Sequence, residues 1–408
     1  MAASILLRNS SAETPPPAPP ASTANSSSNP NQDDIAHWIK DLSSDAFSLR
    51  QEAAVRLLAA GAAARPPLIE LAAGSDPETR AAARRLVALI DRSEFRRRLE
   101  AFAADADGRQ GLSLPGWPEY QKLVGSDQQS RALFVDMQRQ EGPLIAATFG
   151  GSKRAPEELF ESRLVRLAQW QNPNGERGNM PPVGSCAAML FLAASPDITV
   201  TDAAASFVQN IIQRPPVNAA LGPENSQPAL RKLIVTWLLQ CPNKNEDLLR
   251  QRLGVISTSG LTDALPLALR VCNDPQYLDV TPLTKAIALL IVGQFGNRGD
   301  VAQLEPLLDD TSDCLPQQIQ IPGQNATAVQ VRDVALVMLL TLTDQSPADY
   351  GYTAARLTTP RNYQLQTLYR ETDQQRSEAI AKWREWKTSH AAELKVGKAA
   401  APAEATKK

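Results

Sequence analysis

Apolar positions recur along most of the chain with the three-to-four-residue spacing of an α-helix. Ile35, Trp38, Ile39 and Leu42 fall at i, i+3, i+4 and i+7, which places them on one helical face. Further runs, such as "SCAAMLFLAA" and "LRKLIVTWLLQC", are apolar almost throughout and predict helices that are buried on most sides. No stretch of five or more residues alternates cleanly with β-branched residues between turn signals. The pattern therefore predicts an all-α protein.

The first helices form a unit that recurs after about 30 residues. "DAFSLRQEAAVRLLAAG" begins at Asp45 and "DPETRAAARRLVALI" begins at Asp76. In each, an Arg (Arg50, Arg80) follows within about a turn, and an Ala-rich helix comes next. We expect each Asp to accept hydrogen bonds at a helix N-terminus, and each Arg to lie where it can reach the Asp of an adjacent unit. A ladder of such pairs would hold successive units in register.

This combination of Asp, Arg and Ala positions resembles the HEAT-repeat family of α-solenoids. The resemblance returns over residues 283–342, where a short helix ends at Asp310 and Arg332 opens the helix "VQVRDVALVMLLTLT". Between them, "TSDCLPQQIQIPGQNATA" replaces the usual tight turn and departs from the family pattern. The layout of the whole chain resembles planctomycete-type bacterial HEAT-repeat proteins. That resemblance implies an α-solenoid of HEAT-like helical hairpins with irregular central helices and an extracytoplasmic or cell-envelope setting, but it implies no activity.

Changes in composition divide the chain into five segments. Pro, Ser, Ala and Asn dominate the start, which predicts a disordered tail, and a second low-complexity tail ends the chain. The segments are 1–33 (N-terminal tail), 34–92 (HEAT-like repeat pair), 93–182 (linker helices with an "LPGW" loop block), 183–390 (helical-repeat body with a C-terminal capping helix) and 391–408 (C-terminal tail).

Charge and cysteine spacing exclude several classes of partner and cofactor. The net charge of −2 gives no field that would attract nucleic acid, and acidic residues lie among the arginines of 80–98. The four cysteines form no CxxC pair and only two His occur, so we expect no metal, no cofactor and buried, reduced thiols. The longest apolar run, 286–295, is too short to span a bilayer, although the N-terminal tail could tether the chain to a membrane.

Trp117 and Tyr120 are the candidate partner-binding residues, because two prolines and a glycine around Trp117 indicate a rigid loop, and loop aromatics often anchor partners. The alternative is that Trp117 fills the junction between two helical blocks. For the whole chain, the first hypothesis is a non-enzymatic scaffold for protein–protein interaction. The second is a HEAT-like-repeat enzyme of the cofactor-lyase or nucleic-acid glycosylase type. A shallow apolar groove edged by mixed charges would favour the scaffold, and perturbed carboxylates in a deep polar groove would favour the enzyme.

Overall fold

The computed structural model describes residues 31–150, 156–168, 181–222, 227–241, 245–277, 279–315 and 328–396. Within these ranges the chain is predominantly helical, which confirms the all-α prediction. It divides into two compact units, Met1–Arg97 and Arg98–Lys408, and the division falls inside one long helix. Most of the two predicted tails, the loop at 171–180 and residues 316–327 of the long insertion lie outside the described residues.

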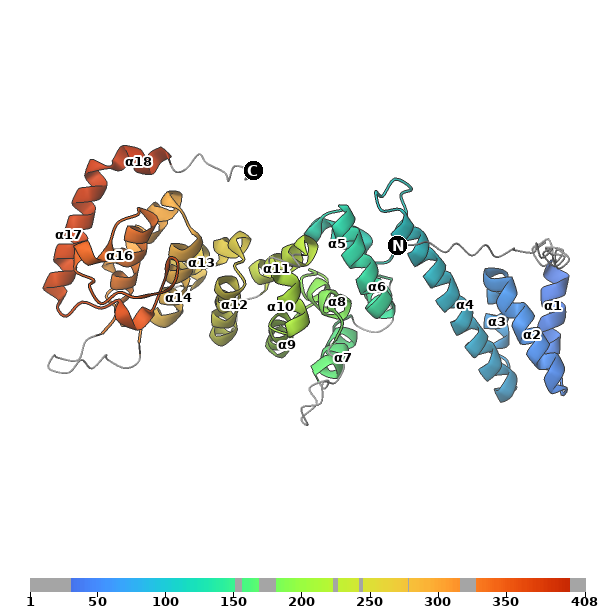
Figure 1. Ribbon diagram of the computed structural model, residues 1–408. Helices are drawn as coiled ribbons and strands as arrows, with labels where there is room; N and C mark the ends of the chain where they lie inside the picture. Colours follow the sequence, from blue (N-terminus) through green and yellow to red (C-terminus); the bar gives the residue numbers. More distant parts are fainter. Residues whose placement is uncertain are drawn as a thin grey trace, which may run out of the picture. The chain divides into compact units, whose positions relative to one another are not determined.

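Two helical hairpins make up the described part of the N-terminal unit (Figure 1, blue). Its elements are α1 (Gln32–Asp41), α2 (Phe47–Ala60), the 3₁₀ turn η1 (Gly61–Ala64), α3 (Arg65–Leu71) and α4 (Pro77–Ala104). All four helices supply one core, which consists of Ile35, Leu42, Ala53, Leu57, Ala64, Leu68, Ala83, Leu86 and Ile90. Alanine at three of these positions lets the helix backbones approach closely, which explains the Ala-rich sequence.

The second unit consists of short helices joined by turns and 3₁₀ segments (Figure 1, green to red). Its helices are α5 (Trp117–Val124), α6 (Gln128–Phe149), α7 (Pro156–Ala168), α8 (Val183–Ala193), α9 (Asp202–Ile212), α10 (Pro215–Leu221), α11 (Pro228–Gln240), α12 (Glu246–Thr258), α13 (Leu265–Asn273), α14 (Pro282–Phe295), α15 (Val301–Leu304), α16 (Val331–Leu342), α17 (Asp373–Ser389) and α18 (Ala391–Val396). The 3₁₀ segments are η2 (Thr262–Ala264), η3 (Pro275–Tyr277), η4 (Arg298–Asp300), η5 (Glu305–Asp309), η6 (Pro347–Tyr350) and η7 (Leu365–Thr367).

Helices that are apolar on every side lie in the interior of this unit. Every residue from Gly184 to Ala193 of α8 is buried, and so is almost every residue of α16. Contacts run mainly between helices that are close in sequence, as in α6 with α8, α12 with α14, and α14 with α16. None of the described helices is long and apolar enough to cross a membrane.

A small antiparallel hairpin and a buried ion pair close the C-terminal end of the unit. The hairpin pairs β1 (Leu357–Thr359) with β2 (Asn362–Tyr363). α17 then begins at its N-cap Thr372, whose side chain accepts a hydrogen bond from the Gln375 amide. Arg376 of α17 donates from Nε to both carboxylate oxygens of Asp333, at 3.0 and 3.1 Å, and so fixes α17 against α16. α18 occupies residues that the sequence had assigned to the C-terminal tail.

All four cysteines are buried and none forms a disulfide bond, which confirms the expectation of buried, reduced thiols. Burial raises the pKa of Cys272 to about 12 and that of Cys186 to about 11. Because the thiolate is the reactive form of cysteine, these two side chains act as small apolar residues of the core.

The turn before α5 depends on glycine for two reasons. Gly116 has φ +80°, a left-handed conformation that L side chains rarely adopt. A Cβ atom at this position would lie 2.9 Å from Ile145 Cγ2 and 2.8 Å from Phe149 Cδ2, both on α6. The "LPGW" sequence is therefore a tight turn that brings the Gly116 backbone against the C-terminal end of α6.

We predict that Gly116→Ala lowers the free energy of unfolding by about 2–4 kcal/mol, through backbone strain and overpacking together. Gly111→Ala is the matched control, because Gly111 has φ +63° but nothing lies within 4 Å of the added Cβ. It should cost only the backbone part, about 1–2 kcal/mol. Urea unfolding of both variants measures the difference, and equal losses would show that the contact with α6 is unimportant.

Candidate partner-binding surface

The structure places Trp117 and Tyr120 inside the protein rather than at its surface. Their side chains are 4% and 0% exposed. Both belong to an aromatic cluster, in which the Trp117 ring centroid lies 5.1 Å from those of Phe102 and Phe134, and the Tyr120 centroid lies 5.5 Å from that of Phe191. Neither residue can therefore anchor a partner in the folded chain, and Trp117 packs between α4, α5 and α6.

The N-terminal ends of α2 and α4 share one hydrogen-bond arrangement, which corresponds to the sequence repeat. Arg50 Nη1 donates to the carbonyl oxygen of Ser44 at 2.8 Å, and Arg80 Nη1 donates to that of Gly74 at 3.3 Å. In both helices the arginine thus reaches back six residues to a carbonyl of the preceding turn. The two arginines are equivalent in structure as well as in sequence.

The partners of these arginines differ from the predicted Asp–Arg ladder. Asp76 caps α4 as expected, because its Oδ2 accepts from the Thr79 amide at 2.7 Å. Asp45 does not cap α2, because the helix begins only at Phe47 and its N-cap is Ala46. The ion pair between the two hairpins joins Arg50 to Glu78, at 3.6 Å, rather than to Asp76.

The third expected pair is also replaced by other contacts. Asp310 and Arg332 meet through their backbones, since the Arg332 amide donates to the Asp310 carbonyl at 3.0 Å. The Asp310 carboxylate pairs with Lys285, and the Arg332 guanidinium pairs with Asp373. The sequence correctly predicted that Asp310 and Arg332 lie close together. Their side chains, however, form ion pairs with charged residues of α14 and α17 instead of with each other.

A groove of about 520 Å³ lies between the N-terminal halves of α2 and α4. Its lining consists of Leu42, Ser43, Ser44, Asp45, Phe47, Arg50, Gln51, Ala54, Asp76, Glu78, Thr79, Ala81, Ala82 and Arg85. Three small alanines therefore lie where larger side chains would fill the space, and charges of both signs edge it. The Arg50 guanidinium lies 5.8 Å from the centre of the Phe47 ring, which itself is 70% exposed.

An exposed apolar stripe follows the groove along α2. Phe47, Val55 and Leu58 fall at i, i+8 and i+11, which places them on a common side of the helix, distinct from that of buried Ala53 and Leu57. Of the eight large exposed apolar residues in the described part of the chain, six belong to the N-terminal unit. An apolar patch that is exposed on a folded protein often marks a surface that binds a partner, whereas single exposed apolar residues are common.

Sequence reasoning missed this stripe, although its signal was present. Helix 47–60 carries apolar residues on more than one face, and a helix in contact with one core needs only one.

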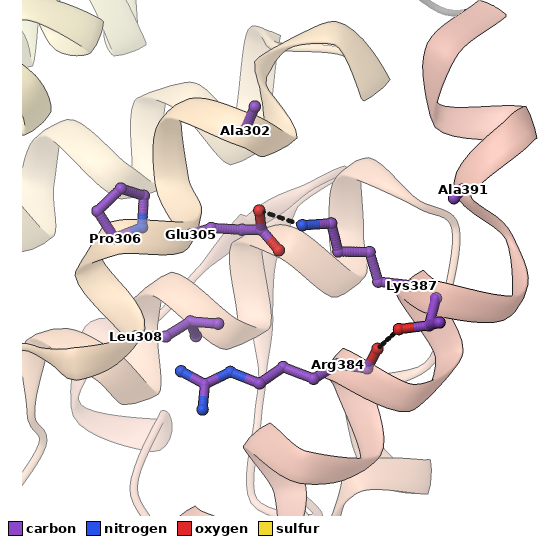
Figure 2. Close-up of a pocket in the computed structure, with 8 residues that line it drawn as sticks. Ala302, Glu305, Pro306, Leu308, Arg384, Lys387 and Ala391 are labelled. Atoms are coloured by element: carbon purple, nitrogen blue, oxygen red, sulfur yellow. Dashed lines mark hydrogen bonds and ion pairs between the residues drawn. The ribbon is translucent and has the colours of Figure 1, made fainter.

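A second hollow of about 670 Å³ lies in the other unit, between η5 and the end of α17 (Figure 2). Its two cations already have partners: Lys387 Nζ lies 2.5 Å from Glu305 Oε2, and Arg384 Nη2 lies 3.0 Å from Asp309 Oδ1. Figure 2 shows the first of these pairs pointing across the hollow. The charges here join two helical segments to each other, which makes this hollow the weaker candidate for a ligand.

Carboxylates and metal ligands add no further candidate among the described residues. Burial raises the pKa of Asp333, but Arg376, Tyr352 and the Gln330 amide all donate to its oxygens. No group of three or more His, Cys, Asp or Glu side chains in the described ranges could hold a metal ion.

Comparison with known proteins adds nothing to these observations: no family model, no curated protein and no solved structure matches the chain.

We predict that Asp76→Ala lowers the melting temperature, whereas Asp45→Ala leaves it nearly unchanged, because only Asp76 caps a helix. Hydrogen bonds from Thr79 hold the pKa of Asp76 below its usual value. Stabilisation by this carboxylate is thus complete above the pKa of an unfolded Asp and is lost as the pH falls through the folded value. Thermal melts from pH 7 down to pH 3 should show the wild type and Asp76→Ala converging. Equal effects of the two substitutions would contradict this account of the repeat.

Proposed function

We propose that this chain is a non-enzymatic scaffold, an α-solenoid of HEAT-like hairpins, whose N-terminal unit binds a protein partner. The observation that carries the proposal is the groove between α2 and α4 together with the apolar stripe beside it. The repeated arginine contacts of α2 and α4 and the packing of α12, α14 and α16 on near neighbours in sequence support the solenoid part.

The chemistry of the surface restricts the kind of partner. Residues 31–97 contain ten Lys and Arg and ten Asp and Glu, so this unit has no net charge with which to attract a polyanion. Phe47, Val55 and Leu58 require an apolar face, and the alanines of the groove leave space for a protruding side chain. An amphipathic protein segment that lays its apolar side along α2 meets both requirements.

Polar groups at the groove would then set the orientation of this segment. Arg85 lines the groove together with Asp45, whereas Arg50 is already paired with Glu78. A segment with an acidic side chain near Arg85 and a basic one near Asp45 complements both. These exposed charges contribute mainly to orientation and specificity, because the apolar contacts supply most of the binding free energy.

We predict that the double variant Phe47→Ser, Val55→Ser binds the partner at least about tenfold more weakly than the wild type, since exposed anchors dominate such interfaces. Partners are identified by affinity purification from native cells, and their dissociation constants are then measured with purified components. Leu357→Ser is the control, because Leu357 is equally an exposed apolar residue, 53% accessible, but lies in the other unit. All three chains should have the same melting temperature. A partner that binds wild type and double variant equally well would refute the proposed surface.

A further inference from the structure

α2 and α4 run side by side in the same direction within the N-terminal unit. In their first turns, Arg50 of α2 forms its ion pair with Glu78 of α4 at 3.6 Å. Just after the end of α2, a Cβ atom at Gly61 would lie 3.8 Å from Oε1 of Glu94, which is further along α4. The two helices therefore border one surface along the whole length of α2.

A row of three arginines follows α4 along this surface. Arg85 lines the groove beside α2, and Arg92 and Arg96 fall at i+7 and i+11 from it, on the same face of the helix. All three side chains are exposed. Leu89, at i+4, lies in the same row and is 40% exposed. At a rise of about 1.5 Å per residue, this arginine row is about 16 Å long. α2 thus presents its apolar stripe to the surface, and α4 presents positive charge.

The acidic residues of the unit leave the arginine row without partners. Each acidic residue of α4 up to Arg97 pairs with an arginine outside the row, in Arg50–Glu78, Arg65–Asp91 and Arg97–Glu94. Asp45 lines the same groove as Arg85 but forms no ion pair with it, and neither does Glu100 with Arg96, one turn away. In the described part of the chain, no hydrogen bond or ion pair holds a guanidinium of the row.

Unpaired like charges on one helix face repel one another, and Arg92 and Arg96 are only one turn apart. A partner that brings negative charge to this face replaces the repulsion with attraction. Carboxylates fit the arginine row well, because a guanidinium group binds a carboxylate through two parallel hydrogen bonds.

We propose that the partner of this surface is an acidic amphipathic helix, with its apolar side on the stripe of α2 and its carboxylates against Arg85, Arg92 and Arg96. This inference rests on the proposed function and adds the charge and the shape of the partner. A helix fits because its own side chains at i, i+7 and i+11 share one face at the spacing of the arginine row. A nucleic acid fits less well, since its phosphates would leave the apolar stripe in water.

The test uses two synthetic amphipathic peptides of about 18 residues, about 27 Å long as helices. Both carry the same leucine face, and the polar face carries glutamate in one peptide and lysine in the other. Fluorescence anisotropy measures their binding to the full-length chain. At low salt the wild type should bind the acidic peptide about tenfold more tightly than the basic one. The preference should shrink at high salt, because exposed ion pairs are screened.

The double variant Arg92→Gln, Arg96→Gln should lose this preference. Its melting temperature should not fall, since the substitutions remove charges that repel each other. Arg84→Gln is the matched control, because Arg84 is also an exposed arginine of α4 without an ion pair. It lies about 100° around the helix from Arg85 and outside the groove, so its loss should leave the preference intact.

The proposal is overturned if the wild type binds both peptides equally well or binds neither. It is also overturned if Arg84→Gln removes the preference as fully as the double variant, or if a DNA duplex binds more tightly than the acidic peptide. Equal binding of both peptides that is lost in Phe47→Ser, Val55→Ser would reject the acidic partner and keep the apolar surface. A preference for the acidic peptide that survives those two substitutions would keep the arginine row and refute the apolar surface.

Discussion

Burial of short, almost wholly apolar helices against helices close to them in sequence is the interaction on which the rest of the structure depends. A fully buried Leu or Val side chain contributes roughly 1.5–3 kcal/mol, and α8 and α16 bury nearly every residue they have. The buried pair of Asp333 and Arg376 cannot compete with this, because desolvation cancels most of its attraction. That pair instead fixes which face of α17 meets α16. Aliphatic burial supplies the stability, and polar contacts select the register.

In the N-terminal unit the burial of apolar side chains is less complete, and the apolar residues that stay exposed are the basis of the proposed function. Its helices bury one core of small and aliphatic residues, yet α2 presents a second apolar face to solvent through Phe47, Val55 and Leu58. A helix with two apolar faces needs two neighbours, and within its own unit α2 has core contacts on only one side. The exposed face is therefore where a partner gains most from binding, and the charged groove beside it orients that partner.

Local sequence signals predicted much of the fold and little of the surface. The caps at Asp76, Asp127 and Thr372 follow from the residues at each helix start, because capping is a local interaction. The prediction that Asp45 caps α2 was wrong, because α2 starts one residue later than its sequence pattern indicates. The burial of Trp117 depends on Phe102 of α4 and Phe134 of α6, two other helices whose packing the loop-like sequence around Trp117 could not reveal.

The measurement that tests the central claim most directly is side-chain footprinting of α2 by a diffusible carbene reagent, read by mass spectrometry. The purified chain and the chain in native cell extract are labelled side by side, with Leu357 as the internal reference. We expect Phe47 and Val55 to be labelled in the purified chain and protected in the extract, while Leu357 is labelled in both. Equal labelling of Phe47 and Val55 in both samples, or their protection in the purified chain, would contradict a partner-binding surface on α2.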